Sequence, residues 1–229
     1  MGIRWDADLK RWLNKDSDPC GSPEDLQRDM KMIEDAARMG SPECMYIAGM
    51  LHSRGLSEDD RDSESEYWFR RAAEKGVPEA WTSLGTMYYT GVGVRKSIPK
   101  AIRLYMKGAI EGDDDAFCKL GIMYEDGTGI RKSVDVAERC YRMGAMNGNM
   151  DCMYFLGTIL RERSEDDPSD MYEAVHWFKK AASRGESASC LELGLHYACD
   201  LEDPDYGEGL KWLSKGSELG DADCKYLLG

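Results

Sequence analysis

Residues 78–112 read PEAWTSLGTMYYTGVGVRKSIPKAIRLYMKGAIEG. In the first half, apolar residues recur at three- and four-residue steps, the spacing of one face of a helix, at Ala80, Leu84, Met87 and Tyr88. The turn at residues 91–97 supplies glycines that can take positive φ, and Ser97 is placed to cap a following helix. The second half ends at Gly112, as helices often do, and carries an apolar stripe of Ala101, Leu104, Tyr105 and Ala109. The segment therefore predicts an antiparallel pair of helices, called here helix A and helix B.

The same pattern recurs along the whole chain. Segments similar to LYMKGAIEG, which closes the quoted unit, end at Gly40, Gly76, Gly112, Gly148, Gly185 and Gly220. Nine residues after each of these comes a second glycine, usually preceded by Leu, at Gly49, Gly85, Gly121, Gly157, Gly194 and Gly229. Gly85 is expected to let neighbouring backbones approach closely, with the ring of Tyr105 filling the space between helices. A regular period of this length is the sequence signature of a repeat architecture.

One helix pair cannot bury its apolar face alone, so successive pairs are expected to stack. We expect an all-α fold, a right-handed solenoid of antiparallel helix pairs that forms a single repeat domain over residues 1–229 with no internal boundary. Residues 5–15 hold the place of a helix A but have Trp12-Leu13 where Leu-Gly is expected, which favours a cap. The predicted parts are an N-terminal cap and first helix pair at 1–40, repeats at 41–76, 77–112, 113–148, 149–185 and 186–220, and a partial last helix at 221–229.

Two parts of the repeat carry a family resemblance. Residues 80–88, AWTSLGTMY, are followed by the turn GVGV, and residues 68–76 read WFRRAAEKG. This combination resembles the Sel-one-like repeat (SLR), a relative of the tetratricopeptide repeat (TPR). Acidic loops replace the glycine turn at three places, residues 53–63, 161–170 and 198–207. The resemblance implies a scaffold or adaptor that assembles other proteins and carries over no catalytic residue, so the chain is not expected to be an enzyme.

The charge balance narrows the class of partner. Lys and Arg number 30 against 43 Asp and Glu, which gives a net charge of −13. Phosphate backbones and anionic membrane surfaces repel such a chain, so neither nucleic acid nor membrane is expected as a partner. No stretch approaches the roughly 18 apolar residues of a membrane span, and the N-terminal MGIRWDADLKRW lacks the apolar centre of a signal peptide. We therefore expect a cytoplasmic protein.

The partner-binding surface is inferred from the repeat register. In TPR-like solenoids helix A lines the concave face, so the resemblance implies a groove with an apolar, Tyr-rich floor beside a ladder of carboxylates. The groove is predicted to consist of Tyr46, Met50, Glu79, Thr82, Thr86, Tyr89, Asp115, Ile122, Glu125, Asp151, Tyr154, Thr158, Arg161, Leu191, Leu195 and Tyr226. Such a surface suits a peptide or helix with apolar anchors and basic flanks. The alternative is that Tyr46 and Tyr154 pack against the adjacent repeat and the acids are solvated surface.

The histidines and cysteines do not indicate a cofactor. His52, His176 and His196 are too scattered for an acid–base site, and the pair His196 and Cys199 lacks the further ligands that a structural zinc site needs. We expect no metal and no cofactor.

Without a secretory signal, the eight cysteines are expected to be free thiols. Cys44, Cys152 and Cys224 occupy a slot held by Ala80 in another repeat, so they are interpreted as small buried residues.

Two alternative functions remain open. A secreted, cysteine-rich branch of the family has been linked to binding or hydrolysis of penicillin-like compounds, and it pairs a helix A Cys with a helix B Cys in every repeat. Only Cys118 and Cys140 approximate such a pair here, so the resemblance disfavours this branch. The second alternative is self-association, as a homo-oligomer, through the uncovered C-terminal helix.

Overall fold

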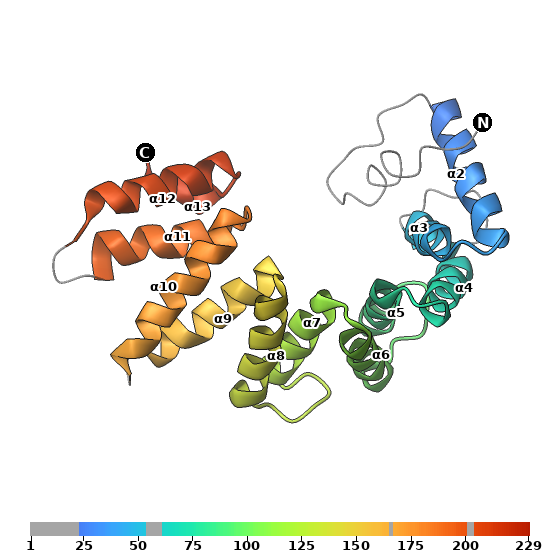
Figure 1. The fold of residues 1–229 in the computed structure, drawn as a ribbon, viewed down its shortest axis with the longest axis horizontal. Helices are drawn as coiled ribbons and strands as arrows, with labels where there is room; N and C mark the ends of the chain where they lie inside the picture. Colours follow the sequence, from blue (N-terminus) through green and yellow to red (C-terminus); the bar gives the residue numbers. More distant parts are fainter. Residues whose placement is uncertain (1–22, 54–60, 165–166, 201–203) are drawn as a thin grey trace. The chain divides into compact units, whose positions relative to one another are not determined.

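The computed structural model describes residues 23–53, 61–164, 167–200 and 204–229. Within these ranges every regular element is a helix (Figure 1), which confirms the all-α solenoid expected from the repeat. The predicted cap at residues 5–15 lies outside the described residues.

The helices follow the predicted alternation. The helix A elements are α3 (Pro42–Ser53), α5 (Pro78–Thr90), α7 (Asp114–Asp126), α9 (Met150–Arg163), α11 (Ser187–Leu195) and α13 (Ala222–Leu227). The helix B elements are α2 (Pro23–Arg38), α4 (Arg61–Glu74), α6 (Ile98–Glu111), α8 (Val134–Asn147), α10 (Pro168–Ser183) and α12 (Tyr206–Glu218). A π-helical turn, η1 (His196–Asp200), extends α11, and the sequence pattern did not predict it.

The turn inside the quoted repeat explains how one helix leads to the next. Gly91 and Gly93 have φ of 83° and 73°, in the left-handed region that favours glycine, as predicted. The predicted side-chain cap by Ser97 is wrong, because this side chain makes no capping hydrogen bond. Pro99, two residues later, has no N–H to offer it, and the N–H of Ala101 bonds to the Ser97 carbonyl oxygen at 3.0 Å instead.

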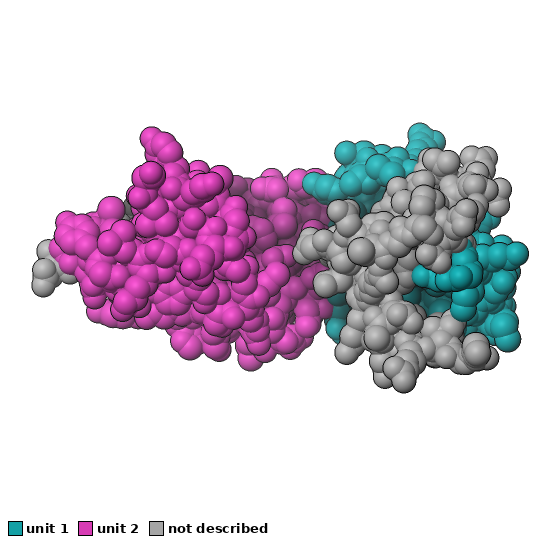
Figure 2. Space-filling view, turned by 90° about the horizontal axis from the view of Figure 1, so that it is seen from above, with its two compact units in different colours: residues 1–113 teal, residues 114–229 magenta. Residues whose placement is uncertain are grey.

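The residues of the chain group into two compact units, residues 1–113 and 114–229 (Figure 2). In the first unit each of the helices α2 to α6 packs against the next, and in the second unit the same holds for α7 to α13. The division falls one residue after the boundary between the predicted repeats 77–112 and 113–148. The prediction of a single domain without a boundary stays a prediction.

Within each unit, the second glycine of the repeat sets the distance between helix A and helix B. A Cβ added to Gly85 of α5 would lie 2.6 Å from the ring of Tyr105 on α6. The same relation recurs in three other repeats, with the pairs Gly49–Phe69, Gly121–Tyr141 and Gly157–Phe178, whereas Gly194 lies against Leu213. Tyr105 and Tyr141 are among the most deeply buried large side chains. The expectation that these glycines permit close packing against an aromatic ring is confirmed.

Candidate partner-binding surface

In the first unit the predicted surface residues lie on α3 and α5. Tyr46 is half-buried, its ring centroid is 5.7 Å from that of Phe69, and its hydroxyl oxygen accepts a hydrogen bond from Ser83 at 3.5 Å. Met50 is also half-buried. The packing of Tyr46 against Phe69 joins α3 to α4, so this ring serves the fold as well as the surface.

The α5 residues differ widely in exposure. Thr82 is only 7% exposed and its Oγ1 has no hydrogen-bond partner, so it offers almost no surface to a partner. Thr86 is exposed, donates to the Thr82 carbonyl oxygen at 3.0 Å, and lies 3.2 Å from the Tyr105 hydroxyl. Tyr89 is half-buried, with Lys96 Nζ 5.8 Å from its ring centroid. Of these three residues, only Thr86 and Tyr89 are accessible to solvent to a substantial extent.

In the second unit the predicted apolar residues lie along α7, α9, α11 and α13. Tyr154 is half-buried with its ring centroid 6.1 Å from that of Phe178, and burial together with nearby Glu192 raises the pKa of its phenol. Thr158 donates to the Phe155 carbonyl oxygen at 2.8 Å. Tyr226 is 83% exposed. The other three members are half-buried: Ile122, Leu191 and Leu195.

Several predicted polar residues of this unit are held by internal contacts. Arg161 of α9 forms an ion pair with Glu192 of α11. The positive charge of Arg161 is therefore neutralised by a residue of the same chain. Glu125 accepts a hydrogen bond from the Tyr141 hydroxyl at 2.7 Å. Glu192 was not among the predicted surface residues, and the only signal for it in the sequence is a charge opposite to that of Arg161 in the preceding repeat.

The carboxylate ladder has a local structural cause. Glu79, Asp115 and Asp151 all lie in the first turn of a helix A. A negative charge there is stabilised by the helix dipole, whatever else it does. Glu79 and Asp151 are exposed, whereas Asp115 accepts a hydrogen bond from Asn149 Nδ2 at 2.7 Å. Two members of the ladder therefore remain open to a partner, one in each unit.

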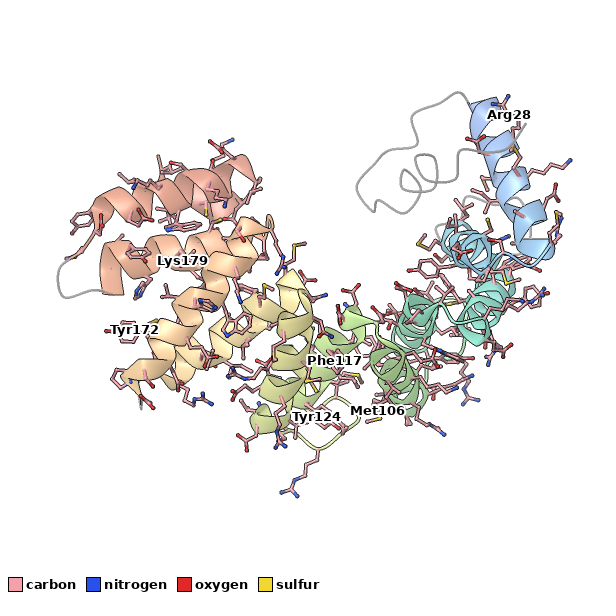
Figure 3. All side chains as sticks on the ribbon, in the orientation of Figure 1. Arg28, Met106, Phe117, Tyr124, Tyr172 and Lys179 are labelled. Atoms are coloured by element: carbon pink, nitrogen blue, oxygen red, sulfur yellow. A yellow bond between two sulfur atoms is a disulfide. The ribbon has the colours of Figure 1, made fainter. Side chains whose placement is uncertain are left out.

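In the second unit a cation–aromatic contact joins α10 to the turn η1. Lys179 extends from α10 toward α11 (Figure 3), and its Nζ lies 5.3 Å from the ring centroid of Tyr197. Tyr172, on the same helix, is exposed and points away from its neighbours (Figure 3).

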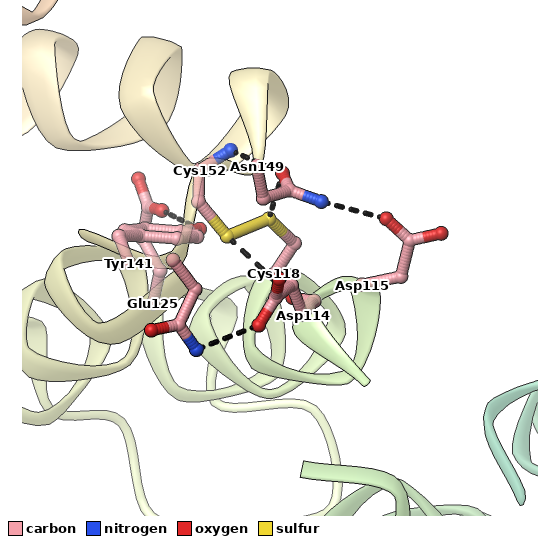
Figure 4. Close-up of a disulfide and its surroundings, with 8 residues drawn as sticks. Asp114, Asp115, Cys118, Glu125, Tyr141, Asn149 and Cys152 are labelled. Carbon is pink, nitrogen blue, oxygen red and sulfur yellow. Dashed lines mark hydrogen bonds between the residues drawn. A yellow bond between two sulfur atoms is a disulfide. The ribbon is translucent and has the colours of Figure 1, made fainter. Parts of the chain in front are cut away.

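The prediction that all cysteines are free is wrong. Cys118 of α7 and Cys152 of α9 form a disulfide with a Cα–Cα distance of 5.4 Å (Figure 4). Asn149 lies at the same junction, where its side-chain oxygen accepts from the Cys152 N–H at 2.9 Å and its amide donates to Asp115. The bond joins two consecutive helix A elements, and Cys140, the partner suggested by the cysteine-rich branch, is a free thiol.

Among the residues that the structure describes, no group of three His, Cys, Asp or Glu side chains is arranged to hold a metal ion. The predicted absence of a metal and a cofactor stays a prediction. None of the described helices combines the length and the apolar character that crossing a bilayer requires.

Comparisons with known proteins agree with the geometry. The family described as Sel1 repeat matches residues 42–77, 78–113, 115–149, 151–186 and 187–221. A crystal structure of a Sel1 repeat protein from Oxalobacter formigenes is similar over 89% of this chain, with 28% identity and a TM-score of 0.76. The present chain spans 59% of the length of that protein.

More distant structures share the fold. An immunity protein from Pseudomonas aeruginosa, PA5088, has a TM-score of 0.67 at 16% identity, over 97% of this chain and 84% of its own. A second immunity protein from that organism, Pa5087, has a TM-score of 0.53 at 22% identity, over 77% of this chain and 67% of its own. No curated protein matches the sequence. Five repeat matches that cover most of the chain, together with the helix-pair architecture, show that the chain belongs to the Sel1 repeat family.

Proposed function

We propose that the chain is a non-enzymatic adaptor that binds a peptide or helix with apolar anchors and basic flanks on its helix A surfaces. Sel1 repeats generally act as protein-interaction scaffolds. The observation that carries the finer proposal is that the helix A elements of each unit carry both a half-buried tyrosine and an exposed carboxylate. These residues are Tyr46 and Glu79 in the first unit, and Tyr154 and Asp151 in the second.

The net charge of the chain supports a positively charged partner. The net charge of −13 favours encounter with a basic segment and disfavours an acidic one. The internal pairing of Arg161 with Glu192 removes a cation that would otherwise attract acidic residues. The partner's apolar anchors would be held by burial against the tyrosine rings, and its Lys or Arg residues by the exposed acids.

A displayed peptide library tests the chemistry of the partner. Selection on the full chain is expected to enrich peptides that combine aromatic or aliphatic residues with Lys or Arg. Enrichment of acidic peptides, or no enrichment over a blank surface, would contradict the proposal.

Charge-neutral variants locate the site. The double variant Glu79→Gln and Asp151→Asn is expected to bind a selected basic peptide more weakly, with a Kd about threefold to tenfold higher. The Kd is also expected to depend less on salt concentration. The control variant, Glu74→Gln and Glu218→Gln, changes the net charge equally at exposed helix B positions. Equal losses in both variants would show that the effect is general attraction rather than a site on helix A.

Tyr226→Ala isolates the contribution of a tyrosine, because this ring is exposed whereas Tyr46 and Tyr154 also pack against neighbouring rings. We expect weaker peptide binding with an unchanged thermal midpoint. Unchanged binding would remove Tyr226 from the site.

Self-association through α13 is a second candidate function. The observation that favours it is a cluster of exposed apolar side chains at the end of this helix, Tyr226, Leu227 and Leu228. In sedimentation velocity, the sedimentation coefficient of the full chain is expected to increase with protein concentration. Leu227→Glu is expected to abolish this increase, whereas Leu210→Glu, at an exposed α12 position, is expected to leave it unchanged. A strict monomer at all concentrations would contradict this candidate.

A further inference from the structure

Two buried cysteines lie on consecutive helix A elements of the second unit. Cys190 of α11 and Cys224 of α13 are both fully buried, and both are free thiols in this structure. We propose that Cys190 and Cys224 are a redox-modification site that forms a second disulfide, joining α11 to α13, when a small disulfide such as glutathione disulfide is the oxidant.

The two side chains meet at a glycine of the intervening helix. A Cβ added to Gly216 of α12 would lie 2.4 Å from Cys224 Sγ and 3.0 Å from Cys190 Cβ. Because Gly216 has no side chain, the two cysteines fill the same small space against α12. Helices α11 and α13 also contact each other directly, as α7 and α9 do.

The existing disulfide joins two consecutive helix A elements at the equivalent junction between α7 and α9. The bond between Cys118 and Cys152 links residues 34 positions apart, and Cys190 and Cys224 have the same separation. Cys152 also lies against a glycine of the intervening helix, since a Cβ on Gly144 would be 2.4 Å from its Sγ. The second cysteine of each pair is therefore held against helix B in the same way.

The helix caps strengthen this correspondence. The N–H of Cys152 donates to the side chain of Asn149 at 2.9 Å, and the N–H of Cys224 donates to the side chain of Asp221 at 2.8 Å. Each cysteine is the third residue of its helix. The polar cap fixes the backbone from which each of these two side chains extends against the glycine of helix B.

The first cysteines of the two pairs differ by one position. Counted from the glycine before each helix, Cys190 is the fifth residue and Cys118 the sixth. In the reduced form Cys190 Sγ lies 3.8 Å from the carbonyl oxygen of Glu186, the residue that caps the N-terminus of α11. Forming the bond requires rotation about the Cα–Cβ bond of Cys190, which moves the sulfur away from that carbonyl and toward Cys224.

The reaction is two successive thiol–disulfide exchanges. The Cys190 thiol loses its proton to solvent, its sulfur attacks one sulfur of glutathione disulfide, and one glutathione leaves as the thiol after taking up a proton. The Cys224 thiol then loses its proton, its sulfur attacks the Cys190 sulfur of the mixed disulfide, and the second glutathione leaves as the thiol after taking up a proton. Two thiols are oxidised, and one glutathione disulfide is reduced to two glutathione molecules.

The order of attack follows from the surroundings of the thiols. Burial raises the pKa of both, but the ammonium of Lys215 acts in the opposite direction on Cys190. The pKa of Cys224 is raised to about 12 by burial and by Asp221. Because the thiolate is the nucleophile, oxidation is expected to be slow and to accelerate when the pH is raised or α13 opens.

Mass spectrometry of the full chain tests the proposal. The protein is incubated with glutathione disulfide, quenched with acid, unfolded, alkylated at its free thiols and digested without reduction. We expect a cross-linked pair of peptides that contain Cys190 and Cys224, about 2 Da lighter than the two free-thiol peptides together. Full alkylation of both cysteines, a stable mixed disulfide at either one, or a bond from either to exposed Cys199 would overturn the proposal.

Thermal unfolding provides an independent readout. Oxidation is expected to raise the thermal midpoint of the wild-type chain by about 5 °C or more, since the new bond restrains the unfolded chain. The rise should persist in Cys140→Ala, a control at another free cysteine, and be absent in Cys190→Ala. An equal rise in Cys190→Ala would assign it to a different modification. If that variant fails to fold, the wild-type peptide pair still decides the question.

Discussion

The glycines that define the repeat determine how closely helix A and helix B pack. In four of the repeats the glycine of helix A lies against an aromatic ring of helix B, and in the quoted repeat this pair is Gly85 and Tyr105. Two effects of opposite sign meet at such a position. A glycine inside a helix costs about 0.5–1 kcal/mol relative to alanine, whereas an extra methyl in a filled core costs about 1–3 kcal/mol.

Gly85→Ala is therefore expected to destabilise the chain by about 1–2 kcal/mol, because the new methyl would lie 2.6 Å from the Tyr105 ring. Urea unfolding measures the change. Gly207→Ala is the matched control, since Gly207 lies in a helix and a Cβ there would meet only the Asp205 side chain at 3.4 Å. That control is expected to be neutral or stabilising. Stabilisation by both substitutions would mean that helix propensity decides at Gly85.

The sequence predicted the identity of these packing residues better than the exposure of the surface residues. A glycine that recurs at a fixed position indicates that a side chain would not fit there, so Gly85 and Tyr105 could be identified from their spacing alone. Thr82 was predicted at the surface but is buried, because the register assigns a helix face only approximately. Glu79 and Asp151 are exposed, but their place in the first turn of a helix explains a negative charge there without a partner, so their role in binding stays a prediction.

At the scale of elements, charged side chains join successive helices of the second unit. Arg142 of α8 contacts Glu138 on its own helix and Glu173 of α10, and Arg163 of α9 contacts Glu138 and Asp170 of α10. The hydrogen bond from Arg142 lowers the pKa of Glu173 below its ordinary value. The cluster links three helices and is a structural feature of the stack.

This cluster predicts a pH dependence of stability. A carboxyl whose pKa is lower in the folded chain stabilises the fold above its unfolded pKa, and this contribution is lost as the pH falls through the folded pKa. Glu173→Gln is expected to cost about 0.5–1 kcal/mol at pH 7 and almost nothing once the pH is well below 4. Denaturant unfolding at the two pH values checks this. Glu162→Gln, at an exposed α9 position, is the control, and a pH-independent cost at Glu173 would argue against the ion pair as its cause.

The ends of helices were predictable where a single glycine marks a position that requires positive φ. Helices α6 and α8 end at left-handed glycines, Gly112 and Gly148, and these were identified from the repeat. The disulfide was not predictable in the same way, because Cys118 and Cys152 occupy different positions in their repeats. Their proximity arises from how one helix A packs on the next, and this arrangement is not contained in the periodicity of either helix.

At the scale of the whole molecule, a repeat chain distributes its stability locally. Each repeat contacts mainly its neighbours, so a bond within one unit is expected to protect that part and leave distant repeats unaffected. The disulfide between Cys118 and Cys152 lies entirely within residues 114–229. It is therefore a local probe of how cooperatively the chain unfolds.

The double variant Cys118→Ala and Cys152→Ala is expected to lose about 3–4 kcal/mol of stability, the scale for a loop of 34 residues. Hydrogen exchange should accelerate in α7, α8 and α9 while the amides of α3 to α6 keep their protection. Cys44→Ala, which removes a buried free thiol of the first unit, controls for the loss of packing. Equal acceleration in both units would show that the chain unfolds as one cooperative body, because only then does a restraint among α7–α9 set the opening free energy of every helix.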